Sequence, residues 1–172
     1  MTKHITIIQG HPDPQTKHFG YVLADAYARG AEEAGHEVRR ISVANLDLPL
    51  LRSKAEWEAE ISSPPVLLSQ QAIGWADHLI IFYPLWLGTM PAVLKAFFEQ
   101  VFRPGFAISN DAQGEMGKKL LSGKTARIVV TMGMPAFFYR WYYRSHSLKS
   151  LQRNILTFTG IGPIKTSLIV NV

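Results

Sequence analysis

Three short segments of this sequence hold most of the residues that could bind a ligand or take part in chemistry. They read GHPDPQTKHFG at residues 10–20, YPLWLGTMP at 83–91 and TMGMPAFFYRWYYRSHS at 131–147. Each combines glycine or proline with histidine, aromatic residues or both. A site for a flat organic molecule needs backbone that approaches the ligand closely and rings that pack on it. These segments, loops 1, 2 and 3, are therefore the candidate binding loops.

Loop 1 favours an anion. Thr16 precedes an amphipathic helical pattern, and the free N–H groups and the hydroxyl at such a helix start favour phosphate. The loop contains neither a GxGxxG pattern nor a GxxxxGK[ST] pattern, which excludes the dinucleotide fingerprint and the Walker loop. The same residues could also have purely structural roles, with Thr16 as a helix cap, His11 in a turn and His18 on the surface.

Loops 2 and 3 favour a flat ring. In loop 2, Trp86 stands among apolar residues between two prolines, which stiffen the backbone beside a heteroaromatic ligand. The alternative is that Trp86 packs in the core or at a subunit interface. In loop 3, Gly133 permits close backbone approach, while Tyr139 and His146 could donate hydrogen bonds to negative charge on a bound ring. Tyr139 and His146 could equally be ordinary residues that flank a helix.

Alternating strand-like and helix-like stretches predict an α/β fold around a parallel sheet. The expected strands cover residues 4–9, 37–43, 78–83, 126–131 and 164–170, and the expected helices 16–34, 66–76, 91–102 and 145–158. This pattern fits a flavodoxin-like three-layer sandwich with a five-stranded parallel sheet of order 2-1-3-4-5, as one domain over residues 1–172. In that order loops 1, 2 and 3 meet at the carboxyl edge of the sheet, where ligands bind. No helical pattern follows the last strand, so we expect one of its faces to be open to a partner subunit.

Composition narrows the classes of function. The 172 residues are 47% hydrophobic and include no cysteine, which predicts a folded globule and excludes disulfides and thiolate chemistry. The sequence shows neither a signal-peptide pattern nor an apolar run long enough for a membrane span, so we expect a cytoplasmic protein without membrane insertion. Residues 1–102 hold 8 basic and 11 acidic residues, a net −3, and residues 103–172 hold 10 and 2, a net +8. Because the basic residues are scattered, they favour a small anion over nucleic acid.

The three loops together resemble the NAD(P)H:quinone oxidoreductase family of flavodoxin-like flavoproteins, the group of DT-diaphorase and the ancillary oxidoreductases of potassium efflux systems. The segments that carry the resemblance are IIQGHPDP at 7–14, YPLW at 83–86, MPAVLKAFFEQVF at 90–102 and TMG at 131–133. The sequence departs from the family pattern where His18 replaces a usual Asn, where Leu87 replaces a frequent second Trp, and at Met132 and Met134 beside the glycine of loop 3.

The resemblance implies a tightly bound flavin, FAD or FMN, with NAD(P)H as co-substrate and a quinone or similar small molecule as acceptor. It implies no metal. Residues of loop 1 would then hold the flavin phosphate, loop 2 would lie along the isoalloxazine, and loop 3 would meet its pyrimidine end. The implied cofactor-binding residues are His11, Thr16, His18, Phe19, Pro84, Leu85, Trp86, Leu87, Thr131, Met132 and Gly133. Tyr139 and His146 fall at or within one residue of the family's Tyr and His that take up charge and relay a proton.

The resulting expectation is a homodimeric flavoenzyme that passes hydride from NAD(P)H through flavin to a quinone. The aromatic cluster at residues 137–143 is too apolar for an exposed monomer surface, which favours contact with a second subunit or with a planar substrate. One alternative is a flavin- or nucleotide-binding regulatory subunit of a transporter with little turnover. Another is a one-electron carrier like flavodoxin, which fits less well because such carriers tend to be acidic and this chain has a net charge of +5.

Overall fold

A five-stranded parallel sheet forms the centre of the computed structural model, which describes residues 1–15, 18–109 and 117–172. The strand order is β2-β1-β3-β4-β5, so the predicted order 2-1-3-4-5 is confirmed. The strands are β1 (His4–Gln9), β2 (Glu37–Ser42), β3 (His78–Pro84), β4 (Thr125–Met132) and β5 (Ile164–Val170). They lie within one or two residues of the predicted ranges.

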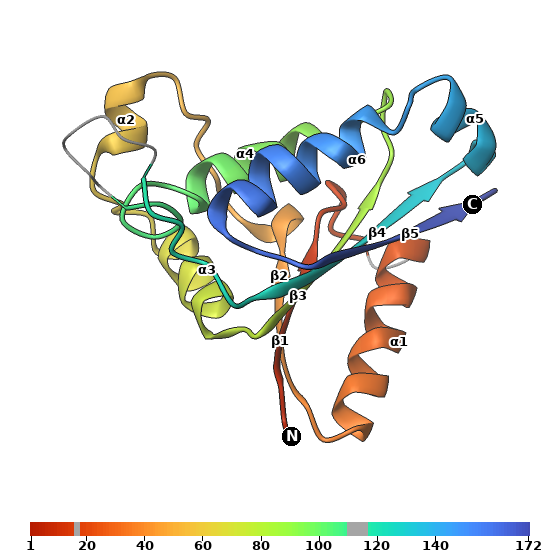
Figure 1. Ribbon diagram of the computed structural model, residues 1–172, viewed down its shortest axis with the longest axis horizontal. Coiled ribbons are helices and arrows are strands. Elements are labelled where there is room, and N and C mark those ends of the chain that lie inside the picture. The colour runs from red at the N-terminus through yellow and green to blue at the C-terminus, as the bar shows by residue number, and fades with distance from the viewer. Residues whose placement is uncertain (16–17, 110–116) are drawn as a thin grey trace.

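Helices cover both faces of the sheet and make three layers (Figure 1). On one side lies α1 (Phe19–Glu33). On the other side lie α3 (Pro64–Trp75), α4 (Ala92–Val101) and α6 (His146–Ser150), which continues as a π-helical segment, Leu151–Thr157. None of the helices in the described part of the chain is long and apolar enough to cross a membrane.

Three short helical segments lie outside the predicted pattern. The stretch between the second predicted strand and the second predicted helix contains part of a 3-10 turn, Val43–Asn45, and a short helix, α2 (Lys54–Glu58). Ser53 explains α2, because its hydroxyl accepts the N–H of Glu56 and so caps the helix. Loop 3 contains α5 (Ala136–Trp141), which begins directly after Pro135. All three are too short for hydrophobic periodicity to reveal.

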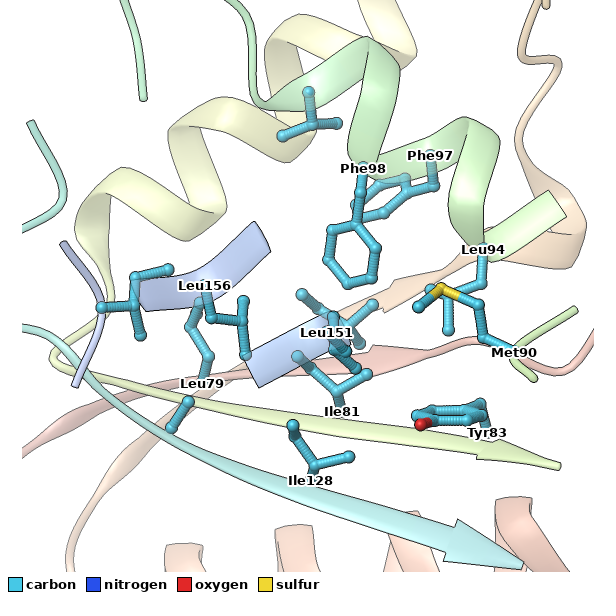
Figure 2. Close-up of a cluster of buried hydrophobic side chains, with 14 of the residues drawn as sticks. Leu79, Ile81, Tyr83, Met90, Leu94, Phe97, Phe98, Ile128, Leu151 and Leu156 are labelled. Carbon is cyan, nitrogen blue, oxygen red and sulfur yellow. The ribbon is translucent and has the colours of Figure 1, made fainter. Parts of the chain in front are cut away.

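Alternating residues of the strands build two separate cores. The larger core lies between the sheet and α3, α4 and α6, where Leu79 and Ile81 of β3 lie in one cluster with Phe97 of α4 and Leu151 (Figure 2). The smaller core lies between the sheet and α1, whose buried alanines allow the helix to pack closely on the strands: Ala24, Ala28 and Ala31. Helices pack on both faces of the sheet, and the carboxyl ends of the central strands are left open at one edge.

Candidate functional site

Loops 1, 2 and 3 meet at the carboxyl edge of the sheet and enclose a hollow of about 320 Å³. This volume lies at the lower end of the range of small-molecule pockets. The residues that line it are His11, His18, Phe19, Gly20, Pro84, Leu85, Trp86, Thr131, Met132, Gly133 and Val172. The structure therefore brings together nine of the eleven residues that the sequence indicates as cofactor-binding. Of the other two, Leu87 does not line the hollow and Thr16 lies outside the described residues.

Loop 1 is organised around Asp13. Its backbone N–H donates to Nδ1 of His11 (3.1 Å), one of its carboxylate oxygens lies 2.8 Å from Nε2 of His18, and the other accepts the N–H of Gln15 (3.0 Å). The hydroxyl of Tyr21 in α1 donates to the Asp13 carbonyl (2.9 Å) and ties the loop to the helix. The hydrogen bonds from Gln15 and His18 hold the pKa of the Asp13 carboxyl below its usual value.

These contacts place the two imidazoles of loop 1 face to face. The rings of His11 and His18 stack with centroids 3.9 Å apart and planes 19° apart. Burial lowers the pKa of His11, and the neighbouring charge of a protonated His18 lowers it further. Both effects favour the neutral form of the His11 imidazole. A phosphate group bound in the hollow would act in the opposite direction, because its negative charge favours protonated His11.

Loop 2 is a tight turn that presents Trp86 to the hollow. The N–H of Trp86 donates to the Thr89 carbonyl (2.9 Å), and the N–H of Thr89 donates back to Trp86 (2.9 Å). Between them Leu87 and Gly88 have φ of 47° and 77°, as a type I′ turn requires. The Leu87 side chain points away and is fully exposed, while Trp86 is half exposed and meets the His11 ring edge to face, with centroids 6.0 Å apart.

Loop 3 contributes backbone to the far side of the hollow. The Thr131 carbonyl accepts the N–H of Leu85 (2.8 Å), which joins loop 3 to loop 2 directly. Thr131 and Met132 are buried, whereas Gly133 is exposed. A Cβ on Gly133 would meet only the Val172 carbonyl oxygen, at 3.7 Å, so there is open space beside the backbone here. Backbone groups in such a position can pair with the polar edge of a heteroaromatic ring.

The two residues expected to act in catalysis do not line this hollow. The Tyr139 side chain is fully buried in the larger core, and its hydroxyl accepts the backbone N–H of Leu148 (3.3 Å). Burial raises the pKa of this phenol. His146 is exposed at the start of α6. The physical reason is the helix α5, which turns only Tyr139 inward and leaves its neighbours Phe138 and Arg140 exposed.

The sequence reasoning did not single out Gly20 and Val172, which line the hollow, or Gln9, which lies next to Gly20. Gln9 ends β1 beneath the start of α1; it is 4% exposed, and its two amide atoms have no hydrogen-bond partner among the described residues. A Cβ on Gly20 would lie 3.8 Å from both of these atoms. A polar residue that ends an otherwise apolar strand was a usable signal. Val172 reaches the hollow because β5 ends beside β4, which only the completed sheet shows.

The residues of the hollow fit a flavin. Trp86 offers an aromatic wall, the imidazoles of His11 and His18 offer donors for phosphate at the start of α1, and loop 3 offers backbone groups. Gln9 does not line the hollow itself, but its buried amide lies next to Gly20 and has no hydrogen-bond partner among the described residues. Among the described residues no group of three or more His, Cys, Asp or Glu could hold a metal ion. The site therefore suits a planar, phosphate-bearing organic group.

Fold and site together define a parallel α/β protein with a ligand hollow at the point where the strand order reverses. The chain belongs to the family described as having a flavodoxin-like fold, whose model matches residues 3–172. This family membership confirms the resemblance that the three loops indicated.

Curated relatives are named as oxidoreductases. A "Ribosyldihydronicotinamide dehydrogenase-like protein traD" of Penicillium crustosum is 32% identical over 154 residues, covering 75% of this chain and 57% of its own length. An "FMN-dependent NADH:quinone oxidoreductase" of Nitratidesulfovibrio vulgaris is 29% identical over 145 residues, covering 75% of this chain and 68% of its own. The chain thus spans little more than half the length of the fungal relative.

A solved structure confirms the fold. The "NAD(P)H:quinone oxidoreductase from Methanothermobacter marburgensis" superimposes with a TM-score of 0.82 at 21% identity, over 100% of this chain and 86% of that one. At this level of identity the likeness concerns the fold.

Proposed function

We propose that the protein is a flavin-dependent oxidoreductase that passes hydride from NAD(P)H, through bound FMN, to a quinone or similar acceptor. The observation that carries the proposal is the hollow in which Trp86, the His11–His18 pair and the loop 3 backbone converge. The names of the fungal and bacterial relatives support the same activity. The alternative of a regulatory transporter subunit gains no support from these names.

In this proposal each loop has its own task. Trp86 and Leu85 pack against the isoalloxazine, His11, His18 and Phe19 surround the phosphate, and residues 131–133 bind the polar edge of the ring with backbone groups. Flavin, when bound, supplies the hydride chemistry. The protein orients the rings and shields them from water. We propose FMN rather than FAD because the bacterial relative is named as FMN-dependent.

Tyr139 and His146 remain proposed as the residues that take up charge and relay a proton. The hydroxyl of Tyr139 is engaged with Leu148, so a merely positioning role for Tyr139 is the competing explanation. The two roles differ in their effect on the rate of flavin reduction, and the substitution described in the Discussion separates them.

We also propose that the active form is a homodimer. Large side chains of α5 and its C-terminal end point into solvent: Phe137 is 72% exposed, Trp141 77% and Tyr142 64%. Contiguous exposed aromatic residues are typical of an interface. Light scattering would then give about twice the monomer mass of 19.3 kDa, and a single 19.3 kDa mass would overturn the dimer. A cytoplasmic location and a single domain over residues 1–172 also remain predictions.

The test of function begins with the absorption spectrum of the purified protein. Flavin bands, followed by chromatography of what heat releases, would identify FMN or FAD. The flavin-loaded protein should then oxidise NADH or NADPH when menadione or benzoquinone is added. The proposal fails if the flavin-loaded protein consumes neither nucleotide with either quinone.

A further inference from the structure

The turn of loop 2 that presents Trp86 is attached to loop 3 at both of its ends. Before the turn, the N–H of Leu85 donates to the Thr131 carbonyl (2.8 Å). After the turn, the Thr89 hydroxyl accepts a hydrogen bond from the Ser147 hydroxyl (3.1 Å) in the first turn of α6. Figure 1 shows the chain that follows β3 beside the connection between α5 and α6. Loop 2 therefore depends on two separate parts of loop 3 for its position.

Thr89 is the residue that pairs with Trp86 across the turn. Its N–H donates to the Trp86 carbonyl and its carbonyl accepts the Trp86 N–H, both at 2.9 Å. A displacement of Thr89 therefore moves the backbone of Trp86 with it. Thr89 itself is exposed, whereas Ser147 is 8% exposed and lies beneath it. The buried Ser147 hydroxyl is thus the fixed side of this contact.

The hydroxyl of Ser147 serves loop 2 rather than the start of its own helix. A serine at a helix start commonly accepts a backbone N–H of the first turn. The cap position of α6 is Ser145, whose side chain makes no such bond, and Ser147 donates across to Thr89 instead. The next residue, Leu148, donates its N–H to the Tyr139 hydroxyl (3.3 Å) and so fixes the first turn of α6 to α5.

The connection between α5 and α6 is strained directly before Ser147. Arg144 and Ser145 have φ of 49° and 52°, and neither is glycine. Residues with a side chain rarely adopt this left-handed region, because the Cβ then lies too close to the backbone. Such strain persists only where the surrounding contacts impose it, and it is found most often at functional sites. One of those contacts is the hydrogen bond from the Ser145 N–H to the Tyr139 carbonyl (3.3 Å).

A second contact from the same connection meets the turn at Gly88. The φ of Gly88 is 77°, and a Cβ there would lie 2.7 Å from the Tyr143 ring, so the ring lies directly against the glycine. Tyr143 stands immediately before the two left-handed residues. The strained connection therefore meets the turn twice, with the Tyr143 ring at Gly88 and with the Ser147 hydroxyl at Thr89.

We infer that Ser147 is a positioning residue of the hollow proposed to bind flavin, the flavin hollow: its hydrogen bond to Thr89 holds the turn in which Trp86 forms the aromatic wall. Ser147 does not line that hollow, so it acts through Thr89 and Trp86. Contacts that hold a binding residue in place before the ligand arrives reduce the ordering cost of binding. The effect on FMN affinity rests on the proposed function, whereas the position of the turn does not.

Variants at both ends of the Ser147–Thr89 hydrogen bond test this inference. Ser147→Ala and Thr89→Val each remove the bond, and each should raise the Kd for FMN about fivefold, the effect of one hydrogen bond of ordinary net strength. The double variant should bind FMN no more weakly than either single variant, because both substitutions remove the same bond. Thr89→Ser keeps the hydroxyl and should restore the affinity of the unsubstituted protein. Since Thr89 is exposed, Thr89→Val tests the same bond if Ser147→Ala does not fold.

Hydrogen exchange of the flavin-free protein separates positioning from a general effect on stability. In Ser147→Ala the amides of Trp86 and Thr89 should exchange about fivefold faster, because the turn opens more often. The amide of Ile81 in β3 should keep its rate, whereas a general loss of stability would accelerate it as well. This measurement needs no flavin. A protein that bound no FMN would therefore refute the proposed function, and the exchange rates would still decide the role of Ser147.

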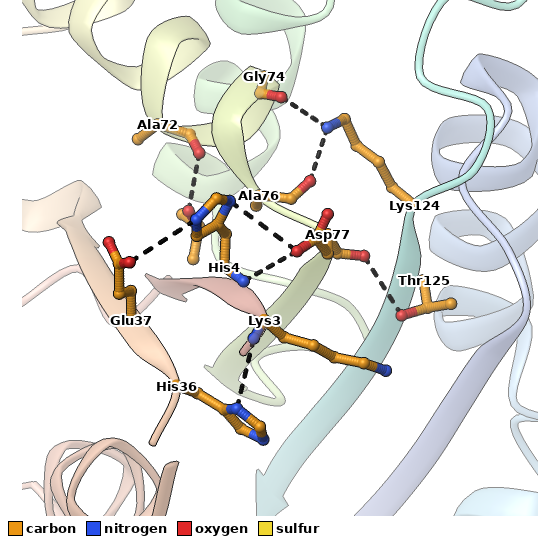
Figure 3. A network of polar contacts seen from close by, with 11 residues as sticks. Lys3, His4, His36, Glu37, Ala72, Gly74, Ala76, Asp77, Lys124 and Thr125 are labelled. Carbon is orange, nitrogen blue, oxygen red and sulfur yellow. Dashed lines mark hydrogen bonds and ion pairs between the residues drawn. The ribbon is translucent and has the colours of Figure 1, made fainter. Parts of the chain in front are cut away.

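Thr125→Val is the matched control at the opposite edge of the sheet. Thr125 begins β4, and its hydroxyl lies 2.7 Å from Nδ1 of His78 and donates to the Asp77 carbonyl (3.4 Å). Figure 3 shows the contact between Thr125 and Asp77. The substitution removes a hydrogen-bonded hydroxyl, as Ser147→Ala does, but away from the turn. It should change neither the FMN affinity nor the exchange rate of the Trp86 amide.

Three results would overturn the inference. The first is an exchange rate of the Trp86 and Thr89 amides that does not change in Ser147→Ala. The second is an equal acceleration of the Ile81 amide, which would make Ser147 a residue of general stability only. The third is an FMN affinity of the double variant that falls by the product of the two single effects, because the two hydroxyls would then act independently.

Discussion

Trp86→Ala tests the assignment of the flavin hollow most directly. The indole is 50% exposed and forms the aromatic side of the hollow. A stacked isoalloxazine would cover roughly 80 Å² of that exposed surface, which is a reasonable share of an aromatic side chain. At about 25 cal/mol per Å² this contact contributes about 2 kcal/mol. The substitution should therefore raise the Kd for FMN about thirtyfold.

The assay is a titration of flavin-free protein with FMN, followed by the quenching of flavin fluorescence. Trp57→Ala is the matched control, because Trp57 lies on α2 and does not line the hollow. It should leave the Kd unchanged. Thermal unfolding of both variants checks that the fold is intact. An FMN affinity of Trp86→Ala equal to that of the unsubstituted protein would refute the stacking argument and return Trp86 to a packing role.

Four further substitutions test the supporting geometry. Tyr139→Phe should leave the FMN affinity nearly unchanged and should slow flavin reduction by NADH in stopped flow. It should also lower the free energy of unfolding in urea by about 1–2 kcal/mol, because the Leu148 N–H loses its partner. An unchanged rate of flavin reduction would leave Tyr139 only a positioning role. Gly88→Ala should lower the free energy of unfolding by about 2 kcal/mol, because φ is 77° and a Cβ would approach the Tyr143 ring to 2.7 Å. Gly30→Ala, in the last turn of α1 with open space around its Cβ, should instead stabilise by about 0.5–1 kcal/mol, and a similar loss at both glycines would contradict this account. Gln9→Met should stabilise flavin-free protein by about 1 kcal/mol, because it removes a buried amide without partners; a loss of stability would contradict that description.

The strands could be predicted because their sequence pattern reflects burial directly. Residues 78–83 are almost continuously apolar, and β3 is indeed the central strand, buried on both faces. The carboxyl-edge rule then placed loops 1, 2 and 3 together without any side-chain information. This reasoning therefore predicted that the three loops meet. The structure places nine of the eleven residues predicted to bind the cofactor around one hollow.

The orientation of side chains within the loops could not be predicted in the same way. Leu87 and Trp86 are neighbours in one turn, yet only Trp86 faces the hollow, since the positive φ of Leu87 turns its side chain outward. Tyr139 stands in an aromatic run without periodicity, and its burial depends on the phase of a six-residue helix. A segment rich in aromatic residues indicates a binding site or an interface. The backbone conformation then decides which aromatic side chains face the site, which lie in the core and which are exposed.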